Sequence, residues 1–180
     1  GTYLCIDNTG VLRLINYLNA DATLPDTHVA SSAVYRDPSA WYHIMAVWDT
    51  AQATASNRVK FYVNGSLLTS LSVATYPNQN TLSYANQSGV VHTIGAINQD
   101  STLQQYLDGY MAEIYFVDGQ ALTPSSFGAF DTTGVWQPLA YTGTYGANGF
   151  YVDFSDNSGT TATTLGKDYS GNGNNWTPNN

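Results

Sequence analysis

Apolar and polar residues alternate strictly over residues 58–63, Arg-Val-Lys-Phe-Tyr-Val. In an extended chain, Val59, Phe61 and Val63 point to one side and the residues between them point to the other. This period of two predicts a half-buried strand with one face on a core and one face in water. Asn64-Gly65 follows and predicts a tight two-residue turn, because these residues tolerate the left-handed backbone that such a turn needs. A returning strand is expected over residues 66–71.

Other runs along the chain also have strand character and are bounded by turn-forming residues. Strands are expected at residues 3–6, 11–18, 28–35, 41–48, 90–97, 110–117 and 150–154. Polar loops are expected at residues 19–25, 72–86 and 98–105, and a connector packed by its own rings at residues 134–149.

A helix signal occurs at one place only. Thr123-Pro124 is typical of a helix start, with proline at the first helical position, so residues 124–130 are expected to form one short helix. Many short strands separated by turn signals predict an all-β sandwich or barrel. Trp41 and Trp48 lie in the predicted central strand, and both are expected in its core. Residues 155–180 are too polar to pack well by themselves.

The composition narrows the classes of partner. Acidic residues outnumber basic ones by 13 to 5, which gives a net charge of −8. Without a basic patch, nucleic acid and anionic membranes are not expected partners. No apolar run approaches the ~20 residues needed to cross a bilayer. Charged residues make up only 10% of the chain, and this scarcity together with many tyrosines favours an extracellular or virion-surface β-protein. Because a strand-like run begins almost at Gly1, we expect a piece of a longer polypeptide.

Catalytic chemistry is not expected. Glu113 is the only glutamate, whereas retaining β-glucanases need two carboxyl groups roughly 5 Å apart. His28, His43 and His92 are far apart in sequence, and the single cysteine cannot complete a zinc site. We therefore expect a protein that is not an enzyme.

Aromatic and amide side chains in or beside the predicted loops are the candidate binding residues. An amphipathic ring can stack on a sugar face while Asn and Asp side chains bind its hydroxyl groups. The candidates are Tyr76, Tyr84, Asn86, Tyr106, Trp136, Tyr145 and Trp176. Such rings are also enriched in subunit interfaces, so both interpretations stay open.

An ordered set of motifs carries a family resemblance. Residues 40–49 read Ala-Trp-Tyr-His-Ile-Met-Ala-Val-Trp-Asp, and residues 59–65 read Val-Lys-Phe-Tyr-Val-Asn-Gly. Residues 107–123 read Leu-Asp-Gly-Tyr-Met-Ala-Glu-Ile-Tyr-Phe-Val-Asp-Gly-Gln-Ala-Leu-Thr. In this order and at these spacings, residues 37–130 resemble the laminin-G-like, concanavalin A-like jelly-roll family. The sequence variant of these motifs found here is similar to that of modules from tail fibres and other surface proteins of tailed phages, marine ones in particular.

The resemblance implies a fold and a function. The fold would be an antiparallel two-sheet jelly-roll sandwich over residues 1–138. Residues 139–180 would be a connector and a strand that completes this sandwich, opens a following module or pairs with a neighbouring chain. The function would be that of a non-enzymatic virion-surface module that adheres to host-surface carbohydrate. The alternative is a spacer or decoration domain that binds other virion subunits, and a homo-oligomer, for example a trimer, is expected.

The resemblance also brings calcium into consideration. Laminin-G-like modules often hold calcium at a sheet rim through oxygen ligands, which suit a hard cation. The candidates here are Asp108, in the matching motif, and the turn residues Asp153, Asp156 and Asp168. The alternative is that these aspartates only form turns. The expected cofactor is thus either none or Ca²⁺.

Overall fold

The computed structural model describes residues 1–17, 26–99 and 102–179. The chain divides into two compact units: unit 1 comprises residues 1–106 and 121–141, and unit 2 comprises residues 107–120 and 142–180. Apart from two 3-10 helices, all regular structure in the described part is β-strand. Every strand pair is antiparallel, so the expected antiparallel all-β class is confirmed. None of the described helices is long and apolar enough to span a membrane.

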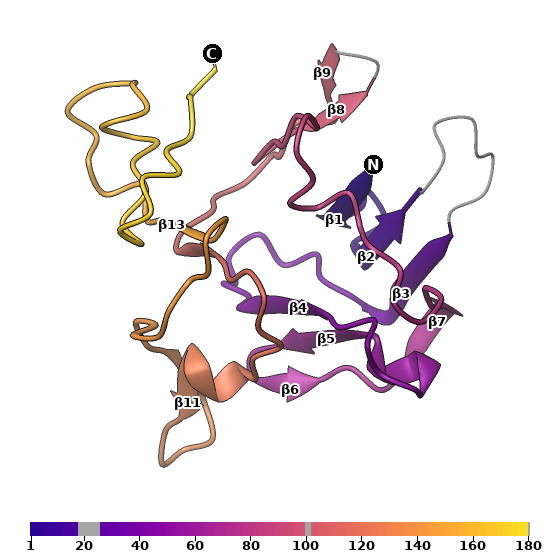
Figure 1. Ribbon diagram of the computed structural model, residues 1–180. Helices are drawn as coiled ribbons and strands as arrows, with labels where there is room; N and C mark the ends of the chain where they lie inside the picture. The colour runs from indigo at the N-terminus through magenta and orange to yellow at the C-terminus, as the bar shows by residue number, and fades with distance from the viewer. Residues whose placement is uncertain (18–25, 100–101, 180) are drawn as a thin grey trace. The chain divides into compact units, whose positions relative to one another are not determined.

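Two larger sheets form unit 1 (Figure 1). The four-stranded sheet has the order β1 (Thr2–Ile6), β2 (Val11–Asn16), β3 (Thr27–Val34), β7 (Leu71–Thr75). The three-stranded sheet has the order β4 (Ile44–Trp48), β5 (Val59–Val63), β6 (Ser66–Leu67). Two small pairs join β8 (Ile97–Gln99) to β9 (Thr102–Gln104) and β11 (Gly128–Phe130) to β12 (Trp136–Pro138).

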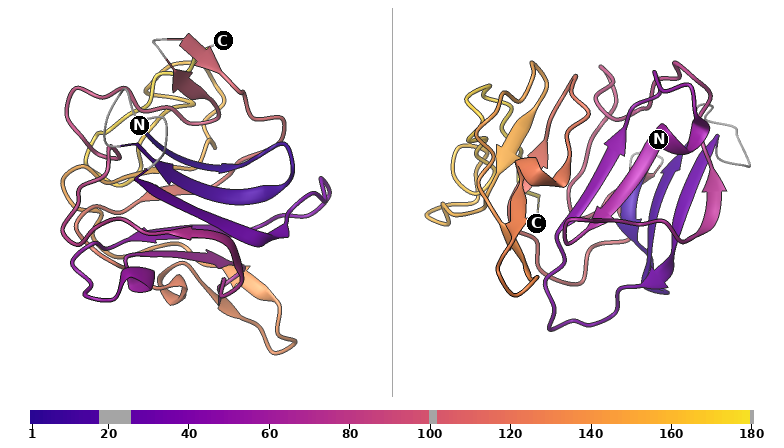
Figure 2. Two further views of the ribbon diagram at one scale, coloured as in Figure 1. Left: turned by 90° about the vertical axis from the view of Figure 1, so that its right-hand side faces the viewer. Right: turned by 90° about the horizontal axis from the view of Figure 1, so that it is seen from below.

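Side chains from both larger sheets pack into one hydrophobic core, and the left view of Figure 2 shows the indigo and purple strands in two layers. The buried members are Leu12, Leu14, Val29, Val59, Phe61 and Val63. Three of them are the alternate residues of β5, whose burial pattern follows the sequence alternation without exception. Phe61 is only 1% exposed. The period of two therefore identified the inner face of this strand correctly.

The turn between β5 and β6 is the one that Asn64-Gly65 predicts. Both residues adopt positive φ, 47° and 75°, and Val63 pairs with Ser66 across the turn. The Asn64 side-chain oxygen accepts a hydrogen bond from the His43 backbone N–H at 2.8 Å. Asn64 thus closes the turn and also ties it to the residue that precedes β4.

Strand β4 is shorter than predicted. It begins at Ile44 and not at Trp41, and the Trp41 side chain is 67% exposed. The expectation that Trp41 lies in the core was wrong, because the residues before Ile44 are not part of the sheet. Trp48, by contrast, packs against the core as expected.

The segment after β6 differs from its prediction. The returning strand ends at Leu67, and Leu71–Thr75 forms β7 in the other sheet, where a loop had been expected from residue 72. Polarity was misleading here, because Ser72 lies on the exposed face and its hydroxyl group donates to the Ser31 carbonyl oxygen at 2.8 Å. The predicted loop at residues 19–25 lies outside the described residues, as does residue 18 of the predicted second strand.

The strand predicted at residues 90–97 was also wrong, apart from its last residue. Residues 90–96 have no strand partner, and Val91 is 68% exposed. The paired strands are instead β8 and β9, within the segment that was predicted as a loop. These two short strands pair only with each other and are not part of the larger sheets. A long run of apolar residues is therefore not needed to form them.

The region from residue 123 to residue 138 contains a helix and a hairpin. The predicted helix is a single 3-10 turn, Pro124–Ser126, with proline at its start. Residues 128–130, which were predicted as helix, form β11 and pair with β12 from the predicted connector. Asp131 closes the turn between them, because its carboxylate accepts hydrogen bonds from the N–H groups of Thr133 and Val135.

Unit 2 is built on the pair β10 (Ile114–Phe116) and β13 (Phe150–Val152). The predicted strand from residue 110 is shortened because Glu113 has φ +55°, which interrupts an extended chain. Tyr110, which was expected on its apolar face, is 90% exposed. The other predicted strand, at residues 150–154, is confirmed through Val152, which is fully buried.

One buried carboxylate accepts several hydrogen bonds in the polar tail of unit 2. Asp168 is 7% exposed, and its two oxygens accept hydrogen bonds from the backbone N–H groups of Tyr151, Ser170 and Asn174 and from the Ser170 hydroxyl group, all at 2.8–2.9 Å. The expectation that this tail packs poorly by itself considered apolar surface only. The hydrogen bond from the Tyr151 N–H to Asp168, together with one from the Tyr169 N–H to the Tyr151 carbonyl oxygen, connects the tail to β13.

Candidate functional site

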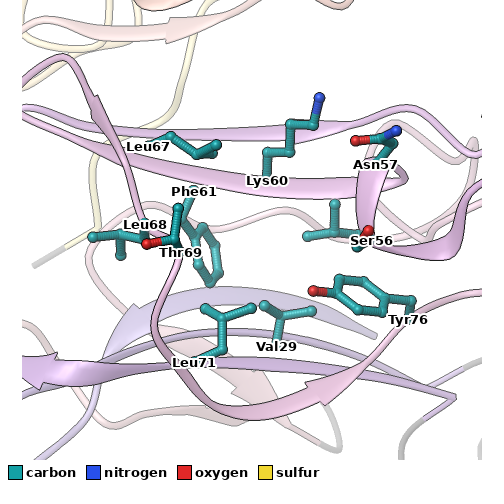
Figure 3. Close-up of a pocket in the computed structure, with 11 residues that line it drawn as sticks. Val29, Ser56, Asn57, Lys60, Phe61, Leu67, Leu68, Thr69, Leu71 and Tyr76 are labelled. Carbon is teal, nitrogen blue, oxygen red and sulfur yellow. The ribbon is translucent and has the colours of Figure 1, made fainter.

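The outer face of the three-stranded sheet carries polar and aromatic side chains. Lys60 and Tyr62 alternate with the core residues of β5, and Figure 3 shows Lys60 and Phe61 leaving the strand on opposite sides. Both outward residues are half-buried. In the described part of the chain, neither the Lys60 ammonium group nor the Tyr62 hydroxyl group has a hydrogen-bond partner. Both groups are therefore free to bind a ligand.

A pocket of about 260 Å³ lies on this face, and we call it the outer-face pocket. Its lining residues come from β4, β5 and two connecting segments: Val47, Asp49, Gln52, Asn57, Lys60, Tyr62, Ala121, Leu122 and Thr123. One aromatic ring stands among a carboxylate, two amides, an ammonium group and a hydroxyl group. This combination offers a sugar both a surface for its C–H groups and hydrogen-bond partners for its hydroxyl groups.

Hydrogen bonds fix the rim of the outer-face pocket. The Gln52 side-chain amide donates to the Asp49 carboxylate at 2.6 Å. The Arg58 guanidinium group donates to the carbonyl oxygens of Gln52, Ala53 and Pro77 at 2.8–2.9 Å. Because one planar side chain holds several backbone oxygens, the loop after β4 is preorganised, and less conformational entropy is lost when a ligand binds.

A second pocket, of about 240 Å³, lies between the two larger sheets (Figure 3). Its lining is mostly apolar and includes Val29, Phe61 and Leu71, so it is continuous with the core. Tyr76, a predicted sugar-contacting residue, lines this pocket and packs partly buried against the core. Figure 3 shows its ring among the residues that line this pocket.

The structure brings together two of the predicted binding residues, Tyr84 and Asn86, in one loop. The His92 ring nitrogen Nε2 accepts a hydrogen bond from the Asn86 backbone N–H at 3.0 Å and lies 3.2 Å from the Tyr84 carbonyl oxygen. The Tyr84 N–H donates to the Thr2 hydroxyl group at 3.0 Å. Tyr106, elsewhere in unit 1, is 68% exposed.

Trp136, another predicted sugar-contacting residue, is part of a packed aromatic cluster. Its ring lies 5.4 Å from that of His43 and 5.2 Å, edge to face, from that of Phe130. It also covers Gly65 and Gly128 so closely that a Cβ atom on either glycine would collide with it. The ring therefore fixes the β11–β12 hairpin to the β5–β6 turn.

The remaining predicted residues, Tyr145 and Trp176, lie in unit 2. The Trp176 ring packs against Phe150 at 4.8 Å. Tyr145 is near-parallel to Tyr115 at 6.5 Å, and Tyr115 stacks on Tyr151 at 4.4 Å. The sugar-contact role of all seven predicted residues stays a prediction.

Glu113 lies beside the near-parallel rings of Tyr115, Tyr145 and Tyr151, which we call the tyrosine face of unit 2. Its Oε2 atom accepts hydrogen bonds from the hydroxyl groups of Tyr115, at 2.9 Å, and Tyr151, at 2.6 Å. Burial raises the pKa of Tyr115 to about 12, and the Glu113 carboxylate adds to the shift. Burial and the hydrogen bond to Glu113 also raise the pKa of Tyr151.

We expect these two tyrosines to ionise last in an alkaline titration followed by phenolate absorbance. Because their pKa values are higher in the folded than in the unfolded chain, the stability that they contribute is complete below the ordinary tyrosine pKa of about 10. It is then lost as the pH rises through about 12, the pKa of folded Tyr115. Glu113→Gln should lower both pKa values partially, since burial remains. Ionisation of all 14 tyrosines as one group near the ordinary pKa would contradict the expectation.

Three of the four aspartates predicted to bind calcium accept hydrogen bonds from nearby backbone and hydroxyl groups. Asp153 and Asp156 each accept hydrogen bonds from the backbone N–H and the hydroxyl group of the serine two residues later. Asp168 is saturated by its own four donors, and Asp108 is exposed. Residues 1–17, 26–99 and 102–179 contain no group of three or more His, Cys, Asp or Glu side chains placed to hold a metal ion. These positions do not fit a calcium site as they stand, and calcium binding stays a prediction.

The outer-face pocket was not among the predicted sites. Its signal was present in the sequence, because the outward positions of the best-patterned strand are Lys60 and Tyr62. The pocket also needs residues 121–123, which lie about 60 residues further along the chain. No local pattern indicates that these residues meet β5.

Comparison with known proteins agrees with the fold. The family model of the concanavalin A-like lectin/glucanases superfamily matches residues 1–128, a range that contains every residue of the outer-face pocket. No curated protein and no solved structure matches the chain. The matched range covers more than half of the 180 residues. The chain therefore belongs to the concanavalin A-like lectin/glucanases superfamily.

Proposed function

We propose that this protein is a carbohydrate-binding module that binds a glycan in the outer-face pocket. The observation that carries the proposal is the position of the Tyr62 ring, which shares one pocket with Asp49, Gln52, Asn57, Lys60 and Thr123. Membership of a superfamily that includes lectins supports it. We also propose that the strands are connected as a jelly roll, as the order of the motifs predicts.

Each pocket residue has its own role in the proposed sugar binding. The Tyr62 ring covers the apolar face of a sugar, while the Asn57 amide and the Lys60 ammonium group bind its hydroxyl oxygens. The Asp49 carboxylate accepts a hydrogen bond from Gln52 through Oδ2, and its Oδ1 accepts one from the Ala51 N–H at 3.2 Å. Lone pairs that remain on these oxygens can accept a sugar hydroxyl proton.

We further propose that the module binds and does not hydrolyse its glycan. A retaining glucanase needs a nucleophile and an acid/base partner about 5 Å apart, and the sequence contains one glutamate, Glu113. That carboxylate already accepts two tyrosine hydroxyl groups. The biological context that we propose is adhesion to host carbohydrate at an extracellular or virion surface, in a tail fibre of homo-oligomeric form.

The second candidate function is structural, and one observation favours it. Leu4 and Ile6 on the edge strand β1 pair with Leu14 and Leu12, so they share the face of the sheet that forms the core. Nevertheless, Leu4 is 51% and Ile6 is 39% exposed. Apolar side chains exposed on an edge strand suit association with another subunit, as in a spacer or decoration domain.

A glycan array with the full chain tests the proposal. We expect Tyr62→Ala to weaken binding to the best array ligand at least tenfold, about 1.4 kcal/mol, because it removes the stacking surface. Tyr62→Phe should retain most of the affinity. The matched control is Tyr106→Ala, which removes a ring that is 68% exposed from another loop. Full binding by a folded Tyr62→Ala variant, or loss only in Tyr106→Ala, would contradict the outer-face pocket as the binding site.

A further inference from the structure

The second pocket of unit 1, which we call the inner pocket, opens beside an incomplete sheet edge. Strand β6 is only two residues long, and beyond it the Leu68 N–H donates to the Phe61 carbonyl oxygen at 2.9 Å. In the described part of the chain, no strand pairs with Val59 or Lys60 on the β6 side. The inner pocket lies at this gap, because Lys60 and Phe61, which leave β5 on opposite sides, both line it (Figure 3).

The inner pocket has apolar walls and polar residues where it meets water. The walls come from the core and the residues packed against it: Val29, Val59, Phe61, Leu68, Leu71 and Tyr76. Three of them, Val29, Val59 and Phe61, are at most 2% exposed. Ser56 and Thr69 line the same pocket and are exposed. A ligand that fits this arrangement buries an apolar part and keeps a polar part in water.

The size of the inner pocket suits a short alkyl chain. Its volume is about 240 Å³. An apolar cavity of about 150 Å³ in another protein stays dry and binds benzene, a ring of six carbon atoms. The inner pocket therefore has room for a chain of about six carbon atoms. Each CH₂ group that such a chain buries should strengthen binding by up to about fourfold.

The inner pocket adjoins the outer-face pocket. Asn57 and Lys60 line both of them. Leu67 lines the inner pocket and pairs directly with Tyr62, which lines the outer-face pocket. Directly paired residues of antiparallel strands point to the same face of the sheet, so the Leu67 side chain lies beside that of Tyr62. One ligand can therefore occupy both pockets.

We propose that the inner pocket binds the alkyl chain of a glycoconjugate whose sugar lies in the outer-face pocket. The sugar part rests on the proposed glycan-binding function, whereas the alkyl part rests on the inner pocket alone. The ligand class is then an alkyl glycoside and not a purely polar glycan. Leu67 and Lys60, at the junction of the two pockets, cover the bond between the sugar and its chain.

NMR titration of the full chain tests the site. The probes are methyl, butyl and hexyl β-glucoside and 1-hexanol, each below the concentration at which it forms micelles. We expect the affinity to rise with chain length, so that hexyl glucoside binds at least tenfold more tightly than methyl glucoside. Hexanol should bind in the same pocket, more weakly than hexyl glucoside. Nuclear Overhauser effects from the alkyl protons to Leu68, Leu71 and Tyr76 should locate the chain.

Variants separate this pocket from unspecific adsorption of alkyl chains. Ser56→Trp places a large ring at an exposed lining position and should reduce the affinity for hexyl glucoside to that for methyl glucoside. Ser88→Trp makes the same change at an exposed serine that lines neither pocket, and it should leave the affinity within about twofold.

The two proposals fail in different ways. Tyr62→Ala should weaken the binding of every glucoside but not that of hexanol, because hexanol does not need the sugar platform. Hexanol binding without any Tyr62-dependent binding of glucosides would refute the glycan function and support the alkyl site. Equal affinity for methyl and hexyl glucoside, or a gain with chain length that survives in Ser56→Trp, would overturn the alkyl site.

Discussion

Asp168→Ala is expected to destabilise unit 2 by about 3–5 kcal/mol, the largest effect that we expect from any single side chain in this unit. The substitution leaves three backbone N–H groups, those of Tyr151, Ser170 and Asn174, without their acceptor. Each unsatisfied N–H group that stays buried costs roughly 1–3 kcal/mol. Hydrogen exchange measured by NMR checks this directly, because these three amides should lose their protection first.

Asp168→Asn is the matched control, since it keeps the shape and one acceptor oxygen and should cost less than the alanine variant. Burial alone would raise the pKa of the Asp168 carboxyl group. The hydrogen bonds that it accepts from backbone N–H groups and from the Ser170 hydroxyl group nevertheless hold this pKa below its ordinary value. Its contribution to stability is therefore present above the ordinary Asp pKa of about 4 and is lost as the pH falls through the pKa of the folded state. Unchanged amide protection in Asp168→Ala would show that the tail is ordered by other contacts.

The core of unit 1 was predictable because the polarity of each residue in a strand indicates whether its side chain is buried. In β5 the apolar residues are Val59, Phe61 and Val63, and burial follows the same alternation. The Asn64-Gly65 turn was predictable for a similar reason, since the required φ values depend on those two residues alone. Local patterns of this kind predict a strand, its inner face and its turn.

The failures have a different physical origin. Nothing in the residues around Trp41 indicates that the sheet begins three residues later, at Ile44. Whether an extended segment becomes a strand depends on a partner that is distant in sequence, as β7 shows by pairing with β3. The packing of the polar residues 155–180 was missed as well, because Asp168 organises its surroundings through hydrogen bonds and not through apolar burial.

The candidate sites were predictable in chemistry and less so in position. Aromatic rings beside amides and carboxylates were expected to bind sugar, and the outer-face pocket has this composition. Its ring, however, is Tyr62 on a strand, and the expected positions were all in or beside loops. The tyrosine face of unit 2 depends on the pairing of Tyr115 with Tyr151, residues 36 positions apart in the chain. Only the register of β10 on β13 brings them together.

The Trp136 ring allows a packing role and a binding role to be distinguished by experiment. We expect Trp136→Ala to destabilise unit 1 by about 2–4 kcal/mol, because it empties the space between the β11–β12 hairpin and the β5–β6 turn. Urea unfolding measures the loss. Gly65→Ala should act in the same direction, since the new Cβ collides with the same ring and the residue has φ +75°.

Trp136→Phe is the informative control. Within the described residues, the Trp136 Nε1–H is buried without a hydrogen-bond partner, so a phenylalanine ring keeps much of the packing and removes an unsatisfied donor. It should cost about 1 kcal/mol or less. If the ring only packs, the folded fraction of Trp136→Ala will bind the best array ligand with the affinity of the unsubstituted protein. Loss of glycan binding with unchanged stability would instead make Trp136 a sugar platform.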